Sequence, residues 1–245
     1  MVTLADDELD DVTIGKAMDI LKLTSTSIDG LQSPLLGSHV RHKSVPKFEP
    51  VTKSFVQVLH LPGHWVCVSN VLTSHPNEVM LFDSLHSVIV SDKLIVQLTS
   101  LLRVSESSDT ITVKIRNCAR QPHGSSLCGY YAIAAAVALC KGQDPTALRY
   151  EPKRLRQCID LGLSTGKFEV ACEKPARLTQ RKDLKVVMKS KLHCLCNTPS
   201  KDEMIACDRC SNWFHCKCLN VSTTVRAKTC NWEGLCCISP VVTLQ

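Results

Sequence analysis

Four side chains in the first half of the chain have the types needed for nucleophilic catalysis by a thiol: His64, Asp83, Gln121 and Cys128. A cysteine reacts as its thiolate, and both a helix N-terminus and a neighbouring imidazolium lower the pKa of a thiol. Cys128 stands where a loop meets a long apolar run, so the sequence predicts that it opens a buried helix. We therefore expect Cys128 to be the nucleophile.

The other three side chains fit the supporting roles of such a site. His64, at the start of a predicted strand, is the expected base, and Asp83, at the end of the next strand, would orient its imidazole and fix its tautomer. Gln121 lies in a loop and would offer its side-chain amide to the oxyanion, together with the backbone amide of Cys128. Each residue alone also has a structural interpretation, as a strand histidine, a turn aspartate or a buried cysteine. Their order along the chain favours the catalytic interpretation.

The elements that must position these side chains follow from hydrophobic periodicity. Apolar residues at helical spacing, or apolar nearly all round, predict helices over 10–23, 91–101, 128–141 and 145–162. Short apolar or alternating runs predict strands over 55–59, 64–68, 78–82 and 111–115. The alanine-rich helix that begins at Cys128 is expected at the centre of the larger domain.

Three motifs carry the candidate residues in a fixed order. They are Gly63-His64-Trp65-Val66, Leu81-Phe82-Asp83-Ser84 and the run from Gln121 to Tyr130. Together they resemble the cysteine proteases that process SUMO and related ubiquitin-like proteins, a family that also includes the adenovirus protease. The resemblance covers about residues 1–165 and implies an α+β, papain-like fold with a central mixed sheet and a buried nucleophile helix. It also implies cleavage after a C-terminal Gly-Gly, with Trp65 covering the tunnel that receives this tail.

Two features differ from the SUMO proteases of that family. The loop from Gln121 to Cys128 is one residue longer and has the adenovirus-type spacing, and Leu127 replaces the acidic residue that usually precedes the nucleophile. The substrate is therefore left open among SUMO, ubiquitin, another ubiquitin-like protein and a viral-type polyprotein.

Nine of the fifteen cysteines lie between Cys194 and Cys237. Six residues form pairs with the short gaps that let one turn of backbone present two ligands to a tetrahedral zinc ion: Cys194-x-Cys196, Cys207-x-x-Cys210 and His215-x-x-Cys218. Cys230, Cys236 and Cys237 follow, and the sequence leaves open which two of these three would serve. It predicts zinc rather than disulfides here, and free thiols elsewhere in a reducing nuclear or cytoplasmic compartment.

The same segment resembles a PHD finger. The motifs that carry the resemblance are Cys194-Leu195-Cys196-Asn197, the run from Glu203 to Asp208, and Asn212-Trp213-Phe214-His215. The resemblance implies two structural zinc ions held by interleaved pairs of ligands. One ion would take Cys194, Cys196, His215 and Cys218. The other would take Cys207, Cys210 and two of the three later cysteines.

PHD fingers of this kind read histone H3 tails, which the resemblance implies for this chain. Trp213 and Met204 would form a cage that holds a methylated lysine by cation–π attraction. Asp202, Glu203 and Asp208 would pair with basic residues of the tail. The alternative is a zinc module that serves only as a protein-interaction scaffold, with Trp213 in its core.

Charge is unevenly distributed along the 245 residues, whose net charge is +6. Twelve Lys and Arg residues lie over 149–191, so we expect a protease-like domain over 1–170, a basic linker over 171–191 and a zinc finger over 192–240. A solvated linker is the favoured interpretation of the basic segment, and direct binding of nucleic acid is a weaker alternative. The apolar runs are shorter than the ~20 residues that span a bilayer, and we expect neither a membrane span nor a secretory signal.

The combined layout resembles transposon-encoded or transposon-derived peptidases. The sequence therefore predicts a cysteine-type peptidase or isopeptidase joined to a zinc finger that binds histone tails or other proteins. The alternative is a catalytically inactive, chromatin-associated binding protein that keeps the protease fold as a scaffold and uses the finger for binding.

Overall fold

The computed structural model of the chain describes residues 8–38, 48–73, 75, 78–88, 91–102, 110–170, 174–175, 184–189, 192–193, 198–199, 203–208 and 213–220. The chain divides into two compact units, Met1–Lys189 and Ser190–Gln245. In the described part of the chain, the helices are all too short or too polar to cross a bilayer.

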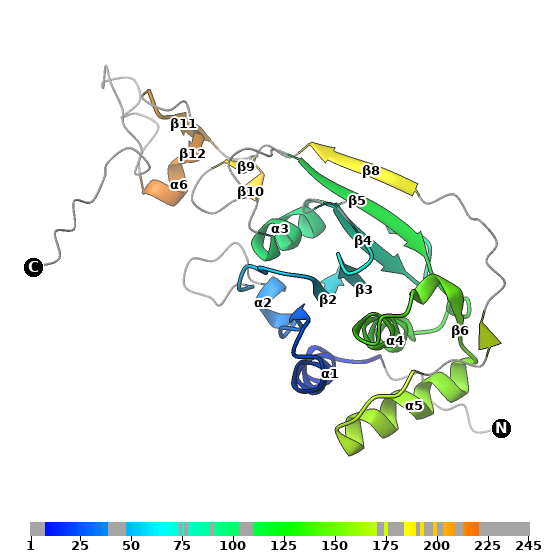
Figure 1. Cartoon of the computed structure of the whole chain (residues 1–245). Coiled ribbons are helices and arrows are strands. Elements are labelled where there is room, and N and C mark those ends of the chain that lie inside the picture. The colour runs from blue at the N-terminus through cyan, green and yellow to red at the C-terminus, as the bar shows by residue number, and fades with distance from the viewer. Residues whose placement is uncertain are drawn as a thin grey trace, which may run out of the picture. The chain divides into compact units, whose positions relative to one another are not determined.

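A six-stranded mixed sheet lies at the centre of the first unit (Figure 1). Its strands are Asp29–Gly30 (β1), Phe55–Leu61 (β2), His64–Ser69 (β3), Glu78–Asp83 (β4), Thr110–Asn117 (β5) and Leu184–Lys189 (β8). They follow the order β1-β2-β3-β4-β5-β8. The pairs β1–β2 and β4–β5 are parallel and the others are antiparallel, so the predicted mixed sheet is confirmed.

The topology of the central strands brings the candidate residues to one edge of the sheet. β4 and β5 are parallel, with Asp83 paired to Asn117, so the loops that follow both strands leave at the same edge. β3 is antiparallel to β4 and therefore begins at that edge with His64. The turn before it contains Gly63 at φ 65, a left-handed conformation that favours glycine.

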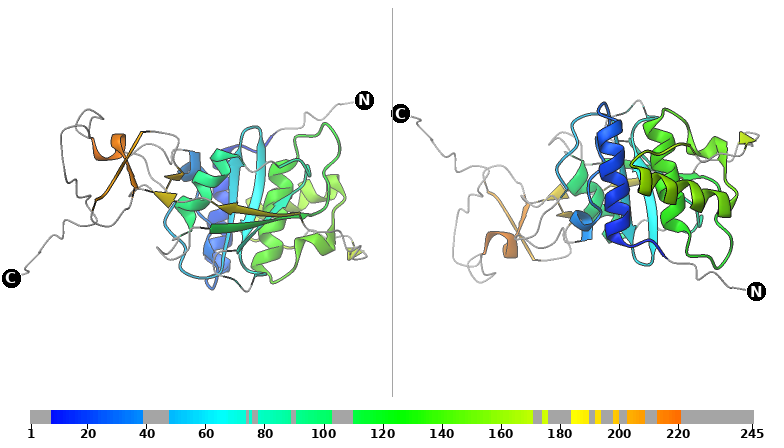
Figure 2. Two further views of the ribbon diagram at one scale, coloured as in Figure 1. Left: turned by 90° about the horizontal axis from the view of Figure 1, so that it is seen from above. Right: turned by 90° about the horizontal axis from the view of Figure 1, so that it is seen from below.

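Helices cover both faces of the sheet. One face carries Asp11–Thr24 (α1), Cys128–Cys140 (α4) and Pro152–Thr165 (α5), and the opposite face carries Asp92–Leu101 (α3) with the short helix Leu35–Ser38 (α2) near it (Figure 2). Alternate side chains of a strand belong to two separate apolar clusters, as in β4, where Met80 and Phe82 lie in one cluster and Val79 and Leu81 in the other. Strands that are buried on both faces read as continuous apolar runs, as β3 and β4 do here between their polar end residues.

The helix α4 is buried all round, as its composition predicts. Every residue from Cys128 to Leu139 is buried. The small side chains of its alanines let it approach α1, α5 and strand β3 closely, and it contacts all three. The nucleophile candidate therefore begins a helix that is fixed in position by the core.

The predicted helix over 145–162 is wrong at its N-terminal end. The segment forms a 3-10 turn at Pro145–Ala147 (η1) and a short strand at Leu148–Arg149 (β6), which pairs with Lys174–Pro175 (β7), before α5 begins at Pro152. Proline disfavours the helical conformation of the residue before it, and proline itself suits the first position of a helix. The Glu151 side chain accepts hydrogen bonds from the N–H groups of Lys153 and Arg154, which caps the new start.

Strand β8 corrects the prediction of a basic linker over 171–191. Residues 184–189 pair antiparallel with β5, from Thr110↔Lys189 to Ile115↔Leu184. The run Leu-Lys-Val-Val-Met-Lys is rich in strand-forming residues, a signal that the overall basic composition concealed. Lysines are common on edge strands because they discourage further pairing, and β8 is the last strand in the order.

The second unit is built from short elements. They are Leu192–His193 (β9), Thr198–Pro199 (β10), Met204–Ala206 (β11), Trp213–His215 (β12) and Cys216–Leu219 (α6). The β11–β12 pair is antiparallel, with Ile205 opposite Phe214. These two side chains, with Cys207 and Cys216, form a small buried cluster.

Candidate active site

His64 and Asp83 form a buried pair at the edge of the sheet. The Nε2 atom of His64 lies 2.7 Å from Oδ1 of Asp83, and the two residues are 7% and 0% exposed. A carboxylate oxygen accepts only, so Nε2 carries the proton. The other ring nitrogen, Nδ1, is then the atom that can take up or release a proton.

The loop after β4 holds the Asp83 carboxylate through its backbone. The N–H of Leu85 donates to Oδ1 at 2.8 Å, and the N–H groups of Ser87 and Val88 donate to Oδ2 at 2.7 and 2.9 Å. The residue types of this loop do not by themselves indicate these donors. Aspartate side chains often accept a hydrogen bond from the backbone N–H two residues later in a turn. This pattern would have indicated the bond from Leu85.

The pKa values of the pair move apart. Burial of the Asp83 carboxyl would raise its pKa, but the hydrogen bonds from His64, Val88 and Leu85 outweigh this and lower the pKa to about 2. Burial of His64 would lower its pKa, but the hydrogen bond to Asp83 and the nearby Cys128 raise it to about 9. At neutral pH the pair is therefore an imidazolium and a carboxylate.

Cys128 lies at the N-terminus of α4 and is 4% exposed. The residue before it, Leu127, makes no side-chain hydrogen bond to the first turn, so the positive end of the helix is not covered by a capping side chain. Cys128 is also close enough to His64 to raise the pKa of the imidazole. Within the described residues, Nδ1 of His64 is buried and makes no hydrogen bond. The structure thus brings His64, Asp83 and Cys128 together and leaves Nδ1 as the nitrogen for the thiol.

Gln121 is buried in the loop that precedes α4, with 5% of its surface exposed. Its Nε2 donates to the carbonyl oxygen of Ser125 at 2.7 Å, and its Oε1 accepts from the hydroxyl of Ser84 at 2.7 Å. The backbone N–H of Gln121 donates to the carbonyl oxygen of Ser84 at 3.0 Å. The loop before α4 and the loop after β4 are therefore joined at Gln121.

Trp65, next to His64 on β3, is 2% exposed. Its Nε1 donates to the carbonyl oxygen of Leu9 at 3.1 Å, and its ring stacks on His60 with centroids 4.4 Å apart. Leu9 also packs against Gly129, where an added Cβ would lie 3.0 Å from the Leu9 Cβ. The segment before α1 therefore lies beside the nucleophile, and the role of Trp65 over a substrate tunnel stays a prediction.

The described zinc-ligand candidates are Cys207, His215 and Cys218. The Nδ1 atom of His215 and the Sγ atom of Cys218 lie 3.9 Å apart, on either side of the turn that begins α6. A tetrahedral zinc ion with ordinary bond lengths would hold two such atoms about 3.6 Å apart, so this pair fits a shared ion. Within the described residues, metal-binding side chains do not gather in groups of three or more. The remaining candidates lie outside the described residues: Cys194, Cys196, Cys210, Cys230, Cys236 and Cys237.

The candidate residues for a histone tail are partly described. Trp213 is 39% exposed, which argues against the alternative that places it in a core. Met204, on the neighbouring strand, is partly buried, and Glu203 and Asp208 are exposed. Asp202 lies outside the described residues.

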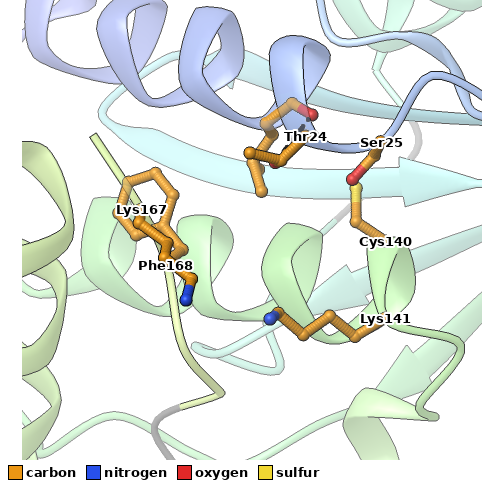
Figure 3. A pocket seen from close by; sticks show the side chains of 7 residues that line it. Thr24, Ser25, Cys140, Lys141, Lys167 and Phe168 are labelled. Carbon is orange, nitrogen blue, oxygen red and sulfur yellow. Dashed lines mark hydrogen bonds between the residues drawn. The ribbon is translucent and has the colours of Figure 1, made fainter.

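A cavity of about 130 Å³ lies at the other end of α4 (Figure 3). It is lined by the end of α1, by Cys140 and Lys141, and by Lys167 and Phe168. A helix rises 1.5 Å per residue, so Cys140 lies about 18 Å along the axis from Cys128. Both lysines contact Glu169, at 3.6 and 3.5 Å. This cavity is therefore separate from the thiol site.

The chain was compared with known proteins by sequence and by structure. No family model matches it. It is 37% identical over 57 residues to the nucleosome-remodeling factor subunit NURF301 of Drosophila melanogaster, a match that spans 22% of this chain and 2% of that protein. That relative is thus matched over only a small part of its length.

Solved structures of SUMO proteases share the fold. The C-terminal Ulp1 protease domain in complex with SMT3, the yeast ortholog of SUMO, has a TM-score of 0.50 at 15% identity and covers 66% of this chain and 79% of that one. Ulp1 with its catalytic cysteine oxidized to a sulfenic acid also has a TM-score of 0.50, at 13% identity, and covers 66% and 80%. Two thirds of the chain is far more than the second unit contains, so the similarity lies mainly in the first unit. The first unit of this chain has the fold of the Ulp1 protease domain.

Proposed function

We propose that the first unit is a cysteine-type peptidase that cleaves after the C-terminal glycine of SUMO, ubiquitin or a similar protein, either in a precursor or in a conjugate. The observation that carries this proposal is the buried His64–Asp83 pair beside Cys128 at the start of α4. The likeness to the Ulp1 domain, solved in complex with SMT3, supports the class of substrate.

The reaction follows from the positions of these side chains. The proton given up by Cys128 resides on Nδ1 of the His64 imidazolium, and the thiolate attacks the carbonyl carbon of the C-terminal glycine. The oxyanion accepts hydrogen bonds from the backbone N–H of Cys128 and from Nε2 of Gln121. The imidazolium then gives its proton to the leaving amine, which departs and leaves a thioester on Sγ. Water, deprotonated by His64, attacks the thioester and releases the free carboxylate and the thiol.

The electrostatics of the pair suit both halves of this reaction. Because the pKa of His64 is about 9, the imidazole keeps a proton at neutral pH that it can give to the leaving amine. Because the pKa of Asp83 is about 2, the carboxylate stays ionised and holds the imidazolium in place. The alternative is an inactive protease fold that serves as a scaffold.

Labelling with an electrophilic probe separates these two functions. SUMO and ubiquitin that each carry a C-terminal vinyl sulfone would be incubated with the wild-type chain, with Cys128→Ala and with Cys118→Ala. Cys118 is a matched control, because burial raises the pKa of its thiol to about 12. We expect an adduct with the wild type and with Cys118→Ala, and none with Cys128→Ala. A wild-type chain that forms no adduct with either probe would favour the scaffold.

We also propose that the second unit is a PHD-type zinc finger that binds two zinc ions and docks on histone H3 tails in the nucleus. Zinc would act structurally, through the predicted cysteines and His215. The spacing of His215 Nδ1 and Cys218 Sγ and the exposure of Trp213 support the zinc finger. The partial identity of the chain with a nucleosome-remodeling factor subunit supports a role at chromatin.

Two measurements test the finger. Native mass spectrometry should find two zinc ions per chain. Pull-down with an H3 peptide methylated on lysine should retain the wild type and Trp213→Phe, which keeps an aromatic face, but lose Trp213→Ala. Equal retention of all three proteins would exclude the cage.

A further inference from the structure

Two consecutive residues connect the loop after β4 to different parts of the candidate site. The Asp83 carboxylate holds the imidazole of His64, and the hydroxyl of Ser84 reaches the side chain of Gln121. Ser84 is 3% exposed and lies 37 positions before Gln121. The contact joins the loop that positions the base to the loop that carries the expected oxyanion donor.

The hydrogen bonds around Gln121 fix which way its amide points. The carbonyl oxygen of Ser125 accepts only, so the Gln121 atom that faces it at 2.7 Å must be the NH₂ nitrogen. The opposite atom, facing Ser84 at 2.7 Å, must then be the amide oxygen. Ser84 therefore donates its hydroxyl proton to that oxygen. Swapping the two amide atoms would put oxygen against the Ser125 carbonyl.

The Ser84 hydroxyl and the Ser125 carbonyl thus hold the carboxamide from its two ends. One of the two N–H bonds of Nε2 points at the Ser125 carbonyl. The second has only a longer contact in the described structure, to the Ser125 hydroxyl at 3.4 Å. That N–H is the one that can turn to an oxyanion when a substrate is bound.

Two further hydrogen bonds join the two loops, one between backbone groups and one from a side chain. The N–H of Gln121 donates to the Ser84 carbonyl at 3.0 Å, and Nε2 of His86 donates to the Cys118 carbonyl at 2.8 Å. His86 has φ 57, a left-handed conformation that is uncommon for residues other than glycine and costs energy unless the surroundings impose it. The two loops therefore form one unit, and removing a single side chain should not separate them.

We infer that Ser84 is a positioning residue of the site: its hydroxyl holds the carboxamide of Gln121 in the orientation that presents an N–H to the oxyanion. The assignment rests on the proposed peptidase function and goes beyond the triad. It makes Ser84 act on the tetrahedral intermediate through Gln121, and leaves formation of the thiolate to His64 and Asp83.

A double-mutant cycle tests this assignment. Hydrolysis of a fluorogenic SUMO amide and of the matching ubiquitin amide would be measured for the wild type, Ser84→Ala, Gln121→Ala and the double variant. We expect Ser84→Ala to lower kcat about tenfold, the effect of one lost neutral hydrogen bond, with little change in KM. Gln121→Ala should lower kcat by ~10²–10³. The double variant should match Gln121→Ala, because Ser84 has no other route to the reaction.

Two controls separate positioning from general damage to the fold. Alkylation of Cys128 by iodoacetamide needs the thiolate but no oxyanion donor, so its rate should be the same in Ser84→Ala as in the wild type. Ser69→Ala removes another buried hydroxyl, which donates to the Phe55 carbonyl at 2.7 Å and has no contact with Gln121 among the described hydrogen bonds. It should leave kcat unchanged below its melting temperature.

The possible outcomes are distinct. Additive losses in the double variant, an unchanged kcat in Ser84→Ala, or a matching fall in the alkylation rate would each overturn the role of Ser84 while the peptidase function stands. A wild-type chain that hydrolyses neither substrate would refute the proposed function, and the assignment of Ser84 would fall with it.

Discussion

The charge state of single residues links the site to the stability of the first unit. The pKa of His64 is raised from 6.5 to about 9, so its stabilising effect is complete below pH 6.5 and is lost as pH rises through 9. The pKa of Asp83 is lowered from 3.8 to about 2, so its effect is complete above pH 3.8 and is lost as pH falls through 2. Both contributions are therefore present between about pH 4 and 6.5.

We expect the free energy of unfolding of the wild type to fall by on the order of 1–3 kcal/mol between pH 6.5 and 9.5 through His64. Urea titrations across this range would measure it, and His64→Gln should remove this part of the fall. His60→Gln is the control: burial lowers the pKa of His60, so its titration weakens the fold on the acid side and the alkaline fall should remain. Equal slopes for the wild type and His64→Gln would contradict the prediction.

At the residue scale, the sequence identified the side chains that carry chemistry but not those that hold them. His64, Asp83 and Cys128 have distinctive types, and their order along the chain was enough to group them. The contact between Ser84 and Gln121 joins two loops, and the types of the two residues do not suggest it. Such a partner becomes evident only when the sheet brings the ends of β4 and β5 to one edge.

Two buried glycines in helices offer a matched test of packing at the scale of elements. A Cβ on Gly162 of α5 would overlap the ring of Phe168, whereas a Cβ on Gly15 of α1 meets Ser33 Oγ at 3.5 Å, an ordinary contact. Alanine is the better helix former by roughly 1 kcal/mol. Gly15→Ala should therefore raise the melting temperature or leave it unchanged.

Gly162→Ala should instead lower the free energy of unfolding by roughly 1–3 kcal/mol, because overpacking outweighs propensity. Removing the ring in Gly162→Ala/Phe168→Ala should relieve the clash, so the two losses should not add. Thermal and urea unfolding would measure all the variants. A stabilising Gly162→Ala would show that Phe168 moves aside at little cost.

The pairing of β8 with β5 predicts a difference between neighbouring proline substitutions. Adjacent N–H groups of an edge strand point alternately toward the partner strand and away from it. Of Val186 and Val187, one therefore points its N–H toward β5, and proline at that position should remove a ladder hydrogen bond. The loss should destabilise the first unit by on the order of 3 kcal/mol. Proline at the other position should cost less. Unfolding midpoints would show this. Equal and negligible effects would restore the linker interpretation.

Elements were predictable where one signal dominated. The apolar run of α4 and the strands β2 to β4 stand out because burial on all sides favours hydrophobic sequence. Strand β5 stands out because its apolar residues alternate with polar ones. β8 was missed because its lysines reflect an edge position rather than a solvated chain. The start of α5 was misplaced because an apolar period continued across Pro152, where local backbone chemistry, and not periodicity, decides where the helix begins.

At the scale of the whole molecule, the two units should respond differently to loss of metal. Structural zinc provides much of the folding energy of small modules, whereas the first unit has its own apolar core. A strong zinc chelator should therefore abolish binding of the H3 peptide and leave probe labelling of Cys128 unchanged. Chelator saturated with zinc beforehand is the control. Loss of labelling on chelation would mean that the first unit also depends on a metal.

The complete burial of α4 has a consequence for how the molecule moves. With every residue from Cys128 to Leu139 packed on all sides, the helix has no exposed flank along which it could fray. Its hydrogen-bonded amides should exchange with deuterium only when the entire first unit opens. The helix therefore holds the backbone of Cys128 in place while the surface loops move.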